Sequence, residues 1–159
     1  MTAKIAIVTG GTRGIGLSIG RKLAADGFQV VALYNGNEEA AKACEKEISA
    51  KTFRVDVTDF EACQNVCAEI EKNLGPITVL VNNAGGVFWS GILDTTENGW
   101  DALYKANLRH VYLCTQRVAR GLVEHELPGS IISVTSIEGV RAAPGYATYA
   151  AAKAGVINY

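Results

Sequence analysis

Short runs of hydrophobic, often β-branched residues recur along the chain and predict five strands. They lie at residues 4–8, 28–33, 52–57, 77–83 and 130–136. Successive positions in these runs are apolar, which is typical of strands in a sheet that is covered on both faces. The runs therefore predict a sheet with helices on each side.

Between these runs, hydrophobic residues recur at helical spacing. The predicted helices cover 15–25, 38–48, 59–73 and 97–125, and a last helix begins near Tyr146. Strands that alternate with helices form parallel βαβ units, because parallel neighbours need a crossover connection. The pattern predicts an α/β fold with a doubly wound parallel sheet, in a single domain over residues 1–159. The longest irregular span, 85–99, is expected to form a wall of the site.

Charge and hydropathy exclude several classes of function. The chain has 15 basic and 16 acidic residues and a formal net charge of -1, so no overall field attracts nucleic acid or an anionic membrane. The first apolar run is too short for a signal peptide, and no later run reaches membrane-spanning length. We therefore expect a cytoplasmic protein with no nucleic-acid or membrane partner.

The cysteines do not suggest a metal site. Cys44, Cys63, Cys67 and Cys114 form no CxxC pair and have no histidine neighbours that would complete a zinc site. We expect reduced thiols that pack in the interior.

A glycine-rich segment, "TGGTRGIG", follows the first hydrophobic run, with Gly10, Gly14 and Gly16 at its key positions. Such a loop makes a tight turn, lets the backbone approach a pyrophosphate and aims a helix N-terminus at the anion. Glycine-rich turns also occur for purely steric reasons, so the loop alone is weak evidence. Its place between a strand and an amphipathic helix favours dinucleotide binding.

The end of the second predicted strand indicates which dinucleotide is bound. An NAD site usually has an acidic residue here for the adenosine ribose, whereas this chain has Tyr34 and Asn35. Arg13 lies in the glycine loop, and a guanidinium without a nearby carboxylate suits a ribose 2′-phosphate. NADPH is therefore favoured over NADH. The alternative is that Arg13 is a solvated loop charge.

The segment "YATYAAAKAG" places Tyr149 and Lys153 four residues apart, on one face of a helix. An ammonium group beside a phenol favours the phenolate, so the pair suits a proton donor and the group that activates it. Tyr146 lies two turns from Lys153, about 10 Å along the helix axis. We expect Tyr146 to line the pocket.

Together, these motifs resemble the short-chain dehydrogenase/reductase family of the classical type. Besides the glycine loop and the Tyr–Lys pair, the resemblance rests on "DV" at 56–57, "NNAG" at 82–85, Asn107 within the long helix and Ser136 after the fifth strand. In the N-terminal half, "ALYNGNEEAA" and "DVTDFEAC" look most like bacterial acetoacetyl-CoA and 3-oxoacyl thioester reductases. The resemblance implies a Rossmann fold with strand order 3-2-1-4-5.

The resemblance implies four catalytic residues. Ser136 would hydrogen-bond the substrate carbonyl oxygen, and Tyr149 would protonate that oxygen as hydride arrives. Lys153 would bind the nicotinamide ribose and activate the tyrosine. Asn107 would hold a water in the proton relay, leaving its helix locally irregular.

The resemblance also implies a cofactor site. Asp56 and the backbone of Val57 would contact the adenine, while the segment 83–85 would pack beneath the adenosine and brace the sheet. The full set of expected cofactor-binding residues is Gly10, Thr12, Arg13, Gly14, Ile15, Gly16, Tyr34, Asn35, Asp56, Val57, Asn83, Ala84, Gly85, Tyr149 and Lys153.

Several of these residues also have a structural interpretation. Ser136 could cap a loop, with Ser133 and Thr135 as rival hydroxyls. Asp56 could cap the next helix, although Thr58 is better placed to do so.

Other polar and aromatic residues have an ordinary interpretation as well. Asn107 could be an exposed polar position, and His110 and His125 are expected to be packed or solvated. The aromatic residues are expected to pack rather than to contact substrate; they are Phe88, Trp89 and Trp100.

The resemblance predicts an NADPH-dependent carbonyl reductase acting on a 3-oxoacyl thioester such as acetoacetyl-CoA. After "NNAG", however, such reductases continue with an "ITRD"-like segment, whereas this chain has "GVFWSGILDTT". A different small or hydrophobic ketone therefore remains an alternative, as does a nucleotide-binding module without efficient catalysis.

Family members continue beyond the Tyr–Lys helix with a sixth strand, a substrate lid and a seventh strand. None follows Tyr159, so we expect a truncated form or a piece of a longer protein, without the substrate lid. The resemblance implies a homotetramer for the full-length enzyme.

Overall fold

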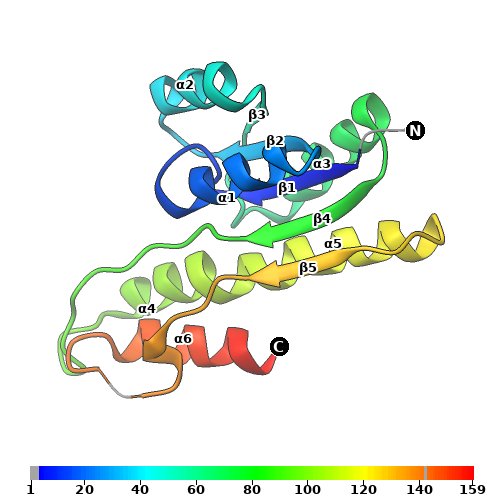
Figure 1. The fold of residues 1–159 in the computed structure, drawn as a ribbon. Helices are drawn as coiled ribbons and strands as arrows, with labels where there is room; N and C mark the ends of the chain where they lie inside the picture. Colours follow the sequence, from blue (N-terminus) through cyan, green and yellow to red (C-terminus); the bar gives the residue numbers. More distant parts are fainter. Residues whose placement is uncertain (1–3, 142) are drawn as a thin grey trace.

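The computed structural model describes residues 4–141 and 143–159, and its centre is a five-stranded parallel sheet (Figure 1). The strand order is β3-β2-β1-β4-β5, which confirms the predicted order. The strands are β1 Ile5–Thr9, β2 Gln29–Tyr34, β3 Lys51–Arg54, β4 Ile77–Asn82 and β5 Ser130–Ser133.

Helices connect successive strands, as parallel pairing requires. They are α1 Gly14–Ala25, α2 Glu38–Ile48, α3 Phe60–Leu74, α4 Glu97–Tyr104, the π-helix η1 Lys105–Arg109, α5 His110–Glu124, the 3₁₀-helix η2 Ile137–Gly139 and α6 Ala147–Asn158. The predicted single helix over 97–125 is thus three consecutive segments, because the backbone changes to π-helical hydrogen bonding around Asn107.

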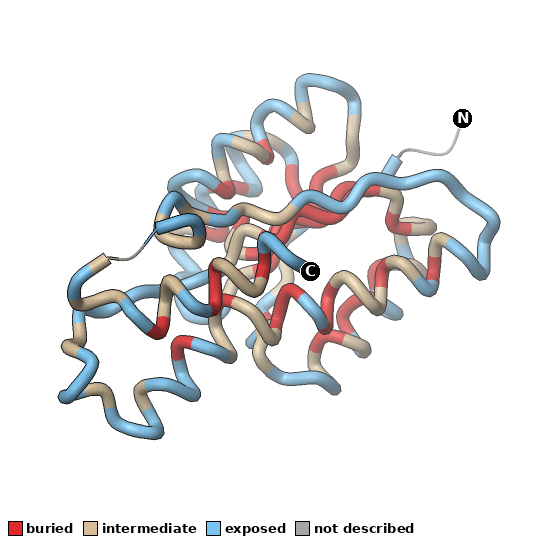
Figure 2. Tube along the Cα trace, turned by 90° about the horizontal axis from the view of Figure 1, so that it is seen from below, coloured by how far each residue is buried: buried red, intermediate tan, exposed pale blue. Residues whose placement is uncertain are grey.

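Alternate residues of the central strands enter two separate hydrophobic cores. On one face Ile5 and Ile7 pack with residues of α3 and α5, and on the other Ala6 and Val8 pack with residues of α1 and α2. Figure 2 shows the buried residues gathered along these strands and on the inward sides of the helices. The sheet is therefore covered on both faces at β1, β2 and β4.

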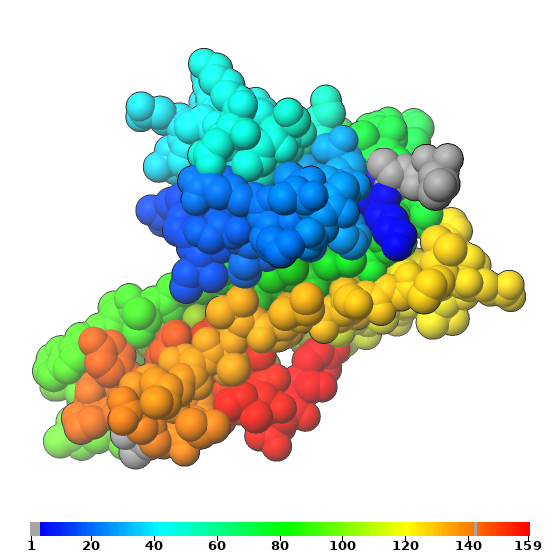
Figure 3. All heavy atoms as spheres, in the orientation of Figure 1, coloured from blue at the N-terminus to red at the C-terminus, as the bar shows by residue number. Residues whose placement is uncertain are grey.

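The two edge strands differ from the sequence prediction. No residue of β3 or β5 is fully buried, and Ile132 is 51% exposed, so apolar burial on both faces was wrong for these two strands. Figure 3 shows β5 and the residues after it uncovered on one face of the molecule. Both strands also end three residues earlier than predicted, because the chain turns away to form the loops at 55–58 and 134–136.

Side-chain caps begin three of the α-helices. Asn37, Asp59 and Thr96 accept hydrogen bonds from the backbone N–H of Ala40, Ala62 and Gly99, respectively. The cap of α3 is therefore Asp59, and the expectation that Thr58 caps this helix was wrong. Thr58 instead donates to Asp56 Oδ1 from its backbone nitrogen and its hydroxyl, over 2.9 and 2.8 Å.

Candidate active site

The glycine loop makes a sharp turn between β1 and α1. Gly10 has a φ of +62°, in the left-handed region that favours glycine. A Cβ at Gly16 would lie 2.2 Å from the carbonyl oxygen of Gly10, so only glycine lets the first turn of α1 pack on the loop. The glycine pattern is therefore required by the backbone as well as by any ligand.

Asn83 ties the glycine loop to the end of β4. Its side-chain nitrogen donates to the carbonyl oxygens of Thr9 and Gly10, over 2.9 and 3.2 Å. In return, Thr9 Oγ1 accepts from the backbone nitrogens of Asn83 and Ala84, each over 2.9 Å. The segment after β4 thus holds the loop against the sheet.

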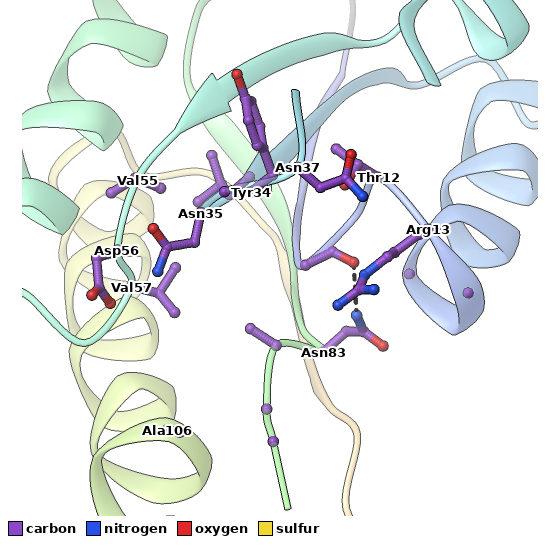
Figure 4. Close-up of a pocket in the computed structure, with 18 of the residues that line it drawn as sticks. Thr12, Arg13, Tyr34, Asn35, Asn37, Val55, Asp56, Val57, Asn83 and Ala106 are labelled. Atoms are coloured by element: carbon purple, nitrogen blue, oxygen red, sulfur yellow. Dashed lines mark hydrogen bonds between the residues drawn. The ribbon is translucent and has the colours of Figure 1, made fainter. Parts of the chain in front are cut away.

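A cavity of about 630 Å³ opens at the carboxyl ends of β1, β2, β3 and β4 (Figure 4). This edge of a parallel sheet is where doubly wound folds bind their ligands. Every expected cofactor-binding residue lines the cavity except Tyr149 and Lys153. The cavity also has lining residues that the sequence interpretation missed, namely Leu33, Gly36, Asn37, Val55, Thr58, Gly86 and Ala106. Of these, Asn37 had a sequence signal, since "NGNEE" is typical of a helix cap.

The cavity suits an anionic nucleotide. The first turn of α1 lines it, has no side-chain cap and contains no acidic residue, so its backbone N–H groups can bind a pyrophosphate. Arg13 also lines the cavity and forms no ion pair with any described residue. These residues fit a dinucleotide cofactor.

Gly85 connects this cavity to the two buried polar residues of the expected catalytic set. A Cβ at Gly85 would lie 2.8 Å from Asn107 Oδ1 and 3.8 Å from Lys153 Nζ. Asn107 and Lys153 are therefore immediate neighbours of a residue that lines the nucleotide cavity.

Lys153 is held in a fixed position beneath Tyr149. Its side chain is buried, and Nζ donates to the carbonyl oxygen of Val134 over 2.9 Å. Nζ also lies 5.8 Å from the centre of the Tyr149 ring. Burial lowers the pKa of the Lys153 ammonium below its usual value. The half-buried ring of Tyr149 leaves the tyrosine accessible to a ligand.

The three hydroxyls at the end of β5 and just after it have different partners. Ser133 accepts a hydrogen bond from Asn82, and Thr135 donates to the carbonyl oxygen of Lys153 over 3.1 Å. Ser136 caps η2 by accepting from Glu138 N over 3.2 Å. Because a serine hydroxyl both donates and accepts, Ser136 keeps its own O–H available to a substrate oxygen.

Asn107 lies in the π-helix and is fully buried, which excludes the exposed polar interpretation. Its side-chain nitrogen donates to the carbonyl oxygens of Gly86 and Leu103, over 2.7 and 2.9 Å. The local irregularity expected for this helix is present.

Two further expectations concern histidines and aromatics. His110 is buried, as one of its two interpretations requires. Burial and the charge of Lys153 lower its pKa to about 4.

The packing expected for the aromatic residues was wrong, because Trp89 is 69% exposed and Phe88 and Trp100 are also exposed. They lie in or just after the loop that follows β4, where sequence alone could not show that residues 4–141 and 143–159 leave them exposed.

Residues 4–159 match the family described as short chain dehydrogenase. The chain belongs to this family. Among the described residues, no helix is both long and apolar enough to cross a membrane, and no cluster of three or more histidine, cysteine or acidic side chains could hold a metal ion.

Curated relatives in the family include reductases. Over 157 residues the chain is 39% identical to the acetoacetyl-CoA reductase of Shinella zoogloeoides, an alignment that covers 99% of this chain and 65% of the relative. It is 37% identical over 160 residues to a 3-oxoacyl-[acyl-carrier-protein] reductase of Staphylococcus epidermidis, and this alignment covers 98% of this chain and 65% of the relative. The chain thus spans just under two thirds of the length of these relatives.

Solved structures show the same fold. A short chain dehydrogenase from Bacillus anthracis superposes with a TM-score of 0.93 at 30% identity, covering 98% of this chain and 66% of that one. A variant of actinorhodin polyketide ketoreductase with NADPH superposes with a TM-score of 0.91 at 29% identity, covering 98% of this chain and 62% of that one.

Proposed function

We propose that this chain carries the nucleotide-binding and catalytic residues of an NADPH-dependent carbonyl reductase, which transfers hydride to a ketone such as the 3-oxo group of acetoacetyl-CoA. The observation that carries the proposal is the position of Lys153, buried below the Tyr149 ring and next to Gly85 of the nucleotide cavity. A lysine has little reason to be buried there unless its charge is used.

When bound, the nicotinamide would supply the hydride. Tyr149 would donate its hydroxyl proton to the carbonyl oxygen of the substrate, and the O–H of Ser136 would hydrogen-bond the same oxygen. The positive charge of Lys153 would favour the phenolate that remains. The hydrogen bond to Val134 holds this ammonium group in place. Asn107 would keep the loop after β4 in place through Gly86 and hold a water in the proton relay.

The thioester substrate is supported by the curated relatives, two of which are named acetoacetyl-CoA reductase and 3-oxoacyl-[acyl-carrier-protein] reductase. A second candidate substrate, another hydrophobic ketone, is favoured by the exposed side chains of Phe88 and Trp89 in the loop after β4. The polyketide ketoreductase among the similar structures agrees with this alternative. A third possibility is nucleotide binding without efficient catalysis.

The reaction can be tested by the loss of NADPH absorbance with acetoacetyl-CoA and a panel of hydrophobic ketones. Tyr149→Phe should abolish turnover while it retains nucleotide binding, and Tyr146→Phe is the matched control that should keep most of the activity. Full turnover in Tyr149→Phe would contradict the proposed acid. Tight NADPH binding with no turnover on any ketone would favour the module without catalysis.

The cofactor can be tested separately through Arg13, whose guanidinium would bind the ribose 2′-phosphate. Arg13→Ala should weaken NADPH binding much more than NADH binding. Equal losses for the two cofactors would remove Arg13 from this role.

A further inference from the structure

A second arginine, Arg54, ends β3 at the rim of the nucleotide cavity: it does not line the cavity itself, but the next residue, Val55, does. Arg54 donates from Nε to the carbonyl oxygen of Asn35 over 2.9 Å, and Asn35 lines the cavity. A guanidinium nitrogen of Arg54 also lies 3.6 Å from Glu38 Oε1. Arg54 therefore contacts both the loop between β2 and α2 and the first residue of α2.

Glu38 brings a negative charge to this rim. It is the first residue of α2 and follows Asn37, the cap of that helix and a lining residue of the cavity. A carboxylate in a first helical turn is favourable for the helix, because it interacts with the positive end of the helix dipole. The same carboxylate would repel a ribose 2′-phosphate. The charged residues at or next to this rim are thus Arg13 and Arg54, which are positive, and Glu38, Glu39 and the cavity-lining Asp56, which are negative.

We propose that the Arg54–Glu38 pair tunes the preference of this rim for a ribose 2′-phosphate over a 2′-hydroxyl. Arg54 acts as a positioning and charge-balancing residue: it fixes the backbone at Asn35 and offsets the carboxylate of Glu38. The inference rests on the proposed NADPH cofactor and adds to it a residue that the family resemblance does not assign.

Because both side chains are exposed, the effect of the Arg54–Glu38 pair on cofactor preference can be tested without disturbing the fold. The side chains of Arg54 and Glu38 are 64% and 60% exposed, and exposed ion pairs contribute little to stability. Their charges still act on a bound phosphate, because screening at moderate salt extends over about 10 Å. Substitutions here should therefore leave the fold intact and change the binding of the phosphate-bearing nucleotide alone.

The test is calorimetric titration of NADP⁺ and NAD⁺ into the wild-type chain, Arg54→Gln, Glu38→Gln and the double variant. Arg54→Gln should weaken NADP⁺ binding about three- to tenfold, and Glu38→Gln should strengthen it about two- to fivefold. The double variant should return to within about twofold of wild type, and NAD⁺ affinity should change by less than about twofold throughout. Higher salt should shrink the differences.

Two controls make the result specific. Arg21→Gln removes an arginine from another exposed ion pair, with Glu47, and should change neither affinity. Arg54→Lys keeps the charge and should retain most of the NADP⁺ preference; a loss as large as in Arg54→Gln would overturn the electrostatic role. A wild-type chain without any preference for NADP⁺ would refute the proposed cofactor. A wild-type preference that Arg54→Gln leaves intact would refute only the inference about Arg54.

Discussion

The side-chain amide of Asn107 donates a hydrogen bond to the carbonyl oxygen of Gly86 over 2.7 Å, and so joins the middle of a helix to the loop after β4. In return, the backbone N–H of Gly86 donates a hydrogen bond to Asn107 Oδ1 over 3.4 Å. Because Gly86 lines the nucleotide cavity, this reciprocal contact couples the shape of the cavity to the π-helix.

Asn107→Ala should destabilise the protein by about 2 kcal/mol, because the carbonyl oxygens of Gly86 and Leu103 would lose a buried donor. Urea unfolding measures this change, and amide hydrogen exchange at Gly86 should become faster. Asn98→Ala, at an exposed position of α4, is the matched control and should stay within about 0.5 kcal/mol of wild type. Equal stability of the two variants would show that the buried amide bonds contribute nothing.

Gly16→Ala should destabilise the protein by about 3 kcal/mol or prevent folding, since its new Cβ would meet the backbone oxygen of Gly10. The neighbouring cavity residue Gly36 offers a control, because a Cβ there meets nothing within 4 Å. Gly36→Ala should be neutral or slightly stabilising. Thermal unfolding of both variants checks this, and a Gly16→Ala protein as stable as wild type would rule out the close approach of α1 to the loop.

Stability should fall as the pH drops from 6.5 toward 4, partly because of His110. Burial holds its folded-state pKa near 4, below the usual 6.5, so between these values the unfolded chain binds more protons than the folded one. The resulting loss reaches about 3 kcal/mol at the acidic end. Urea unfolding across this range should show a shallower pH dependence for His110→Gln than for wild type.

The exposed His125 provides the control for this pH effect. His125→Gln should keep the wild-type slope of stability against pH. If His110→Gln kept it as well, the acid sensitivity would have to come from other groups.

The four thiols should react slowly with a disulfide reagent in the native protein, because all four cysteines are buried. Burial raises the pKa of Cys67 to about 12 and raises that of Cys44, which removes the reactive thiolate at neutral pH. A hydrogen bond with Cys114 lowers the pKa of Cys63, so this thiol is protected by its burial alone. Unfolding in guanidinium should release four reactive thiols. Ser18→Cys, at an exposed position of α1, should add one that reacts at once; rapid reaction of the wild-type chain would contradict this burial.

The order of elements could be predicted from sequence because it depends on local periodicity. Helix α2 occupies the predicted 38–48, since its apolar positions lie within the segment and its capping residues, Asn37 and Ser49, lie directly on either side. The ends of β3 and β5 could not be predicted, because two of the three residues in each of "VDV" and "VTS" are β-branched, yet both segments leave the sheet. Whether such residues stay paired depends on the neighbouring strand.

The candidate site was predictable where a motif specifies the backbone. The glycine loop and "NNAG" meet through Asn83, and their residues line one cavity. The approach of Arg54 to Asn35 could not be read from the sequence, because it joins the ends of two strands through a contact across 19 positions. The exposure of Trp89 likewise depends on what the rest of the fold leaves uncovered.

The π-helix at Lys105–Arg109 also limits how the length of this chain can change. Removing one residue from a helix rotates everything after it by about 100° around the axis. Helix α4 meets α6, whereas α5 turns its buried residues, from Val111 to Gly121, toward the sheet and α3. A π-turn holds about one residue more than an α-turn, so a one-residue deletion within the π-helix would restore regular α-helical bonding and keep that apolar face toward the sheet. The same deletion within α4 would rotate the face toward water. We therefore expect a one-residue gap to preserve the packing of α5 only within the π-helix, where it would instead displace the side chain of Asn107.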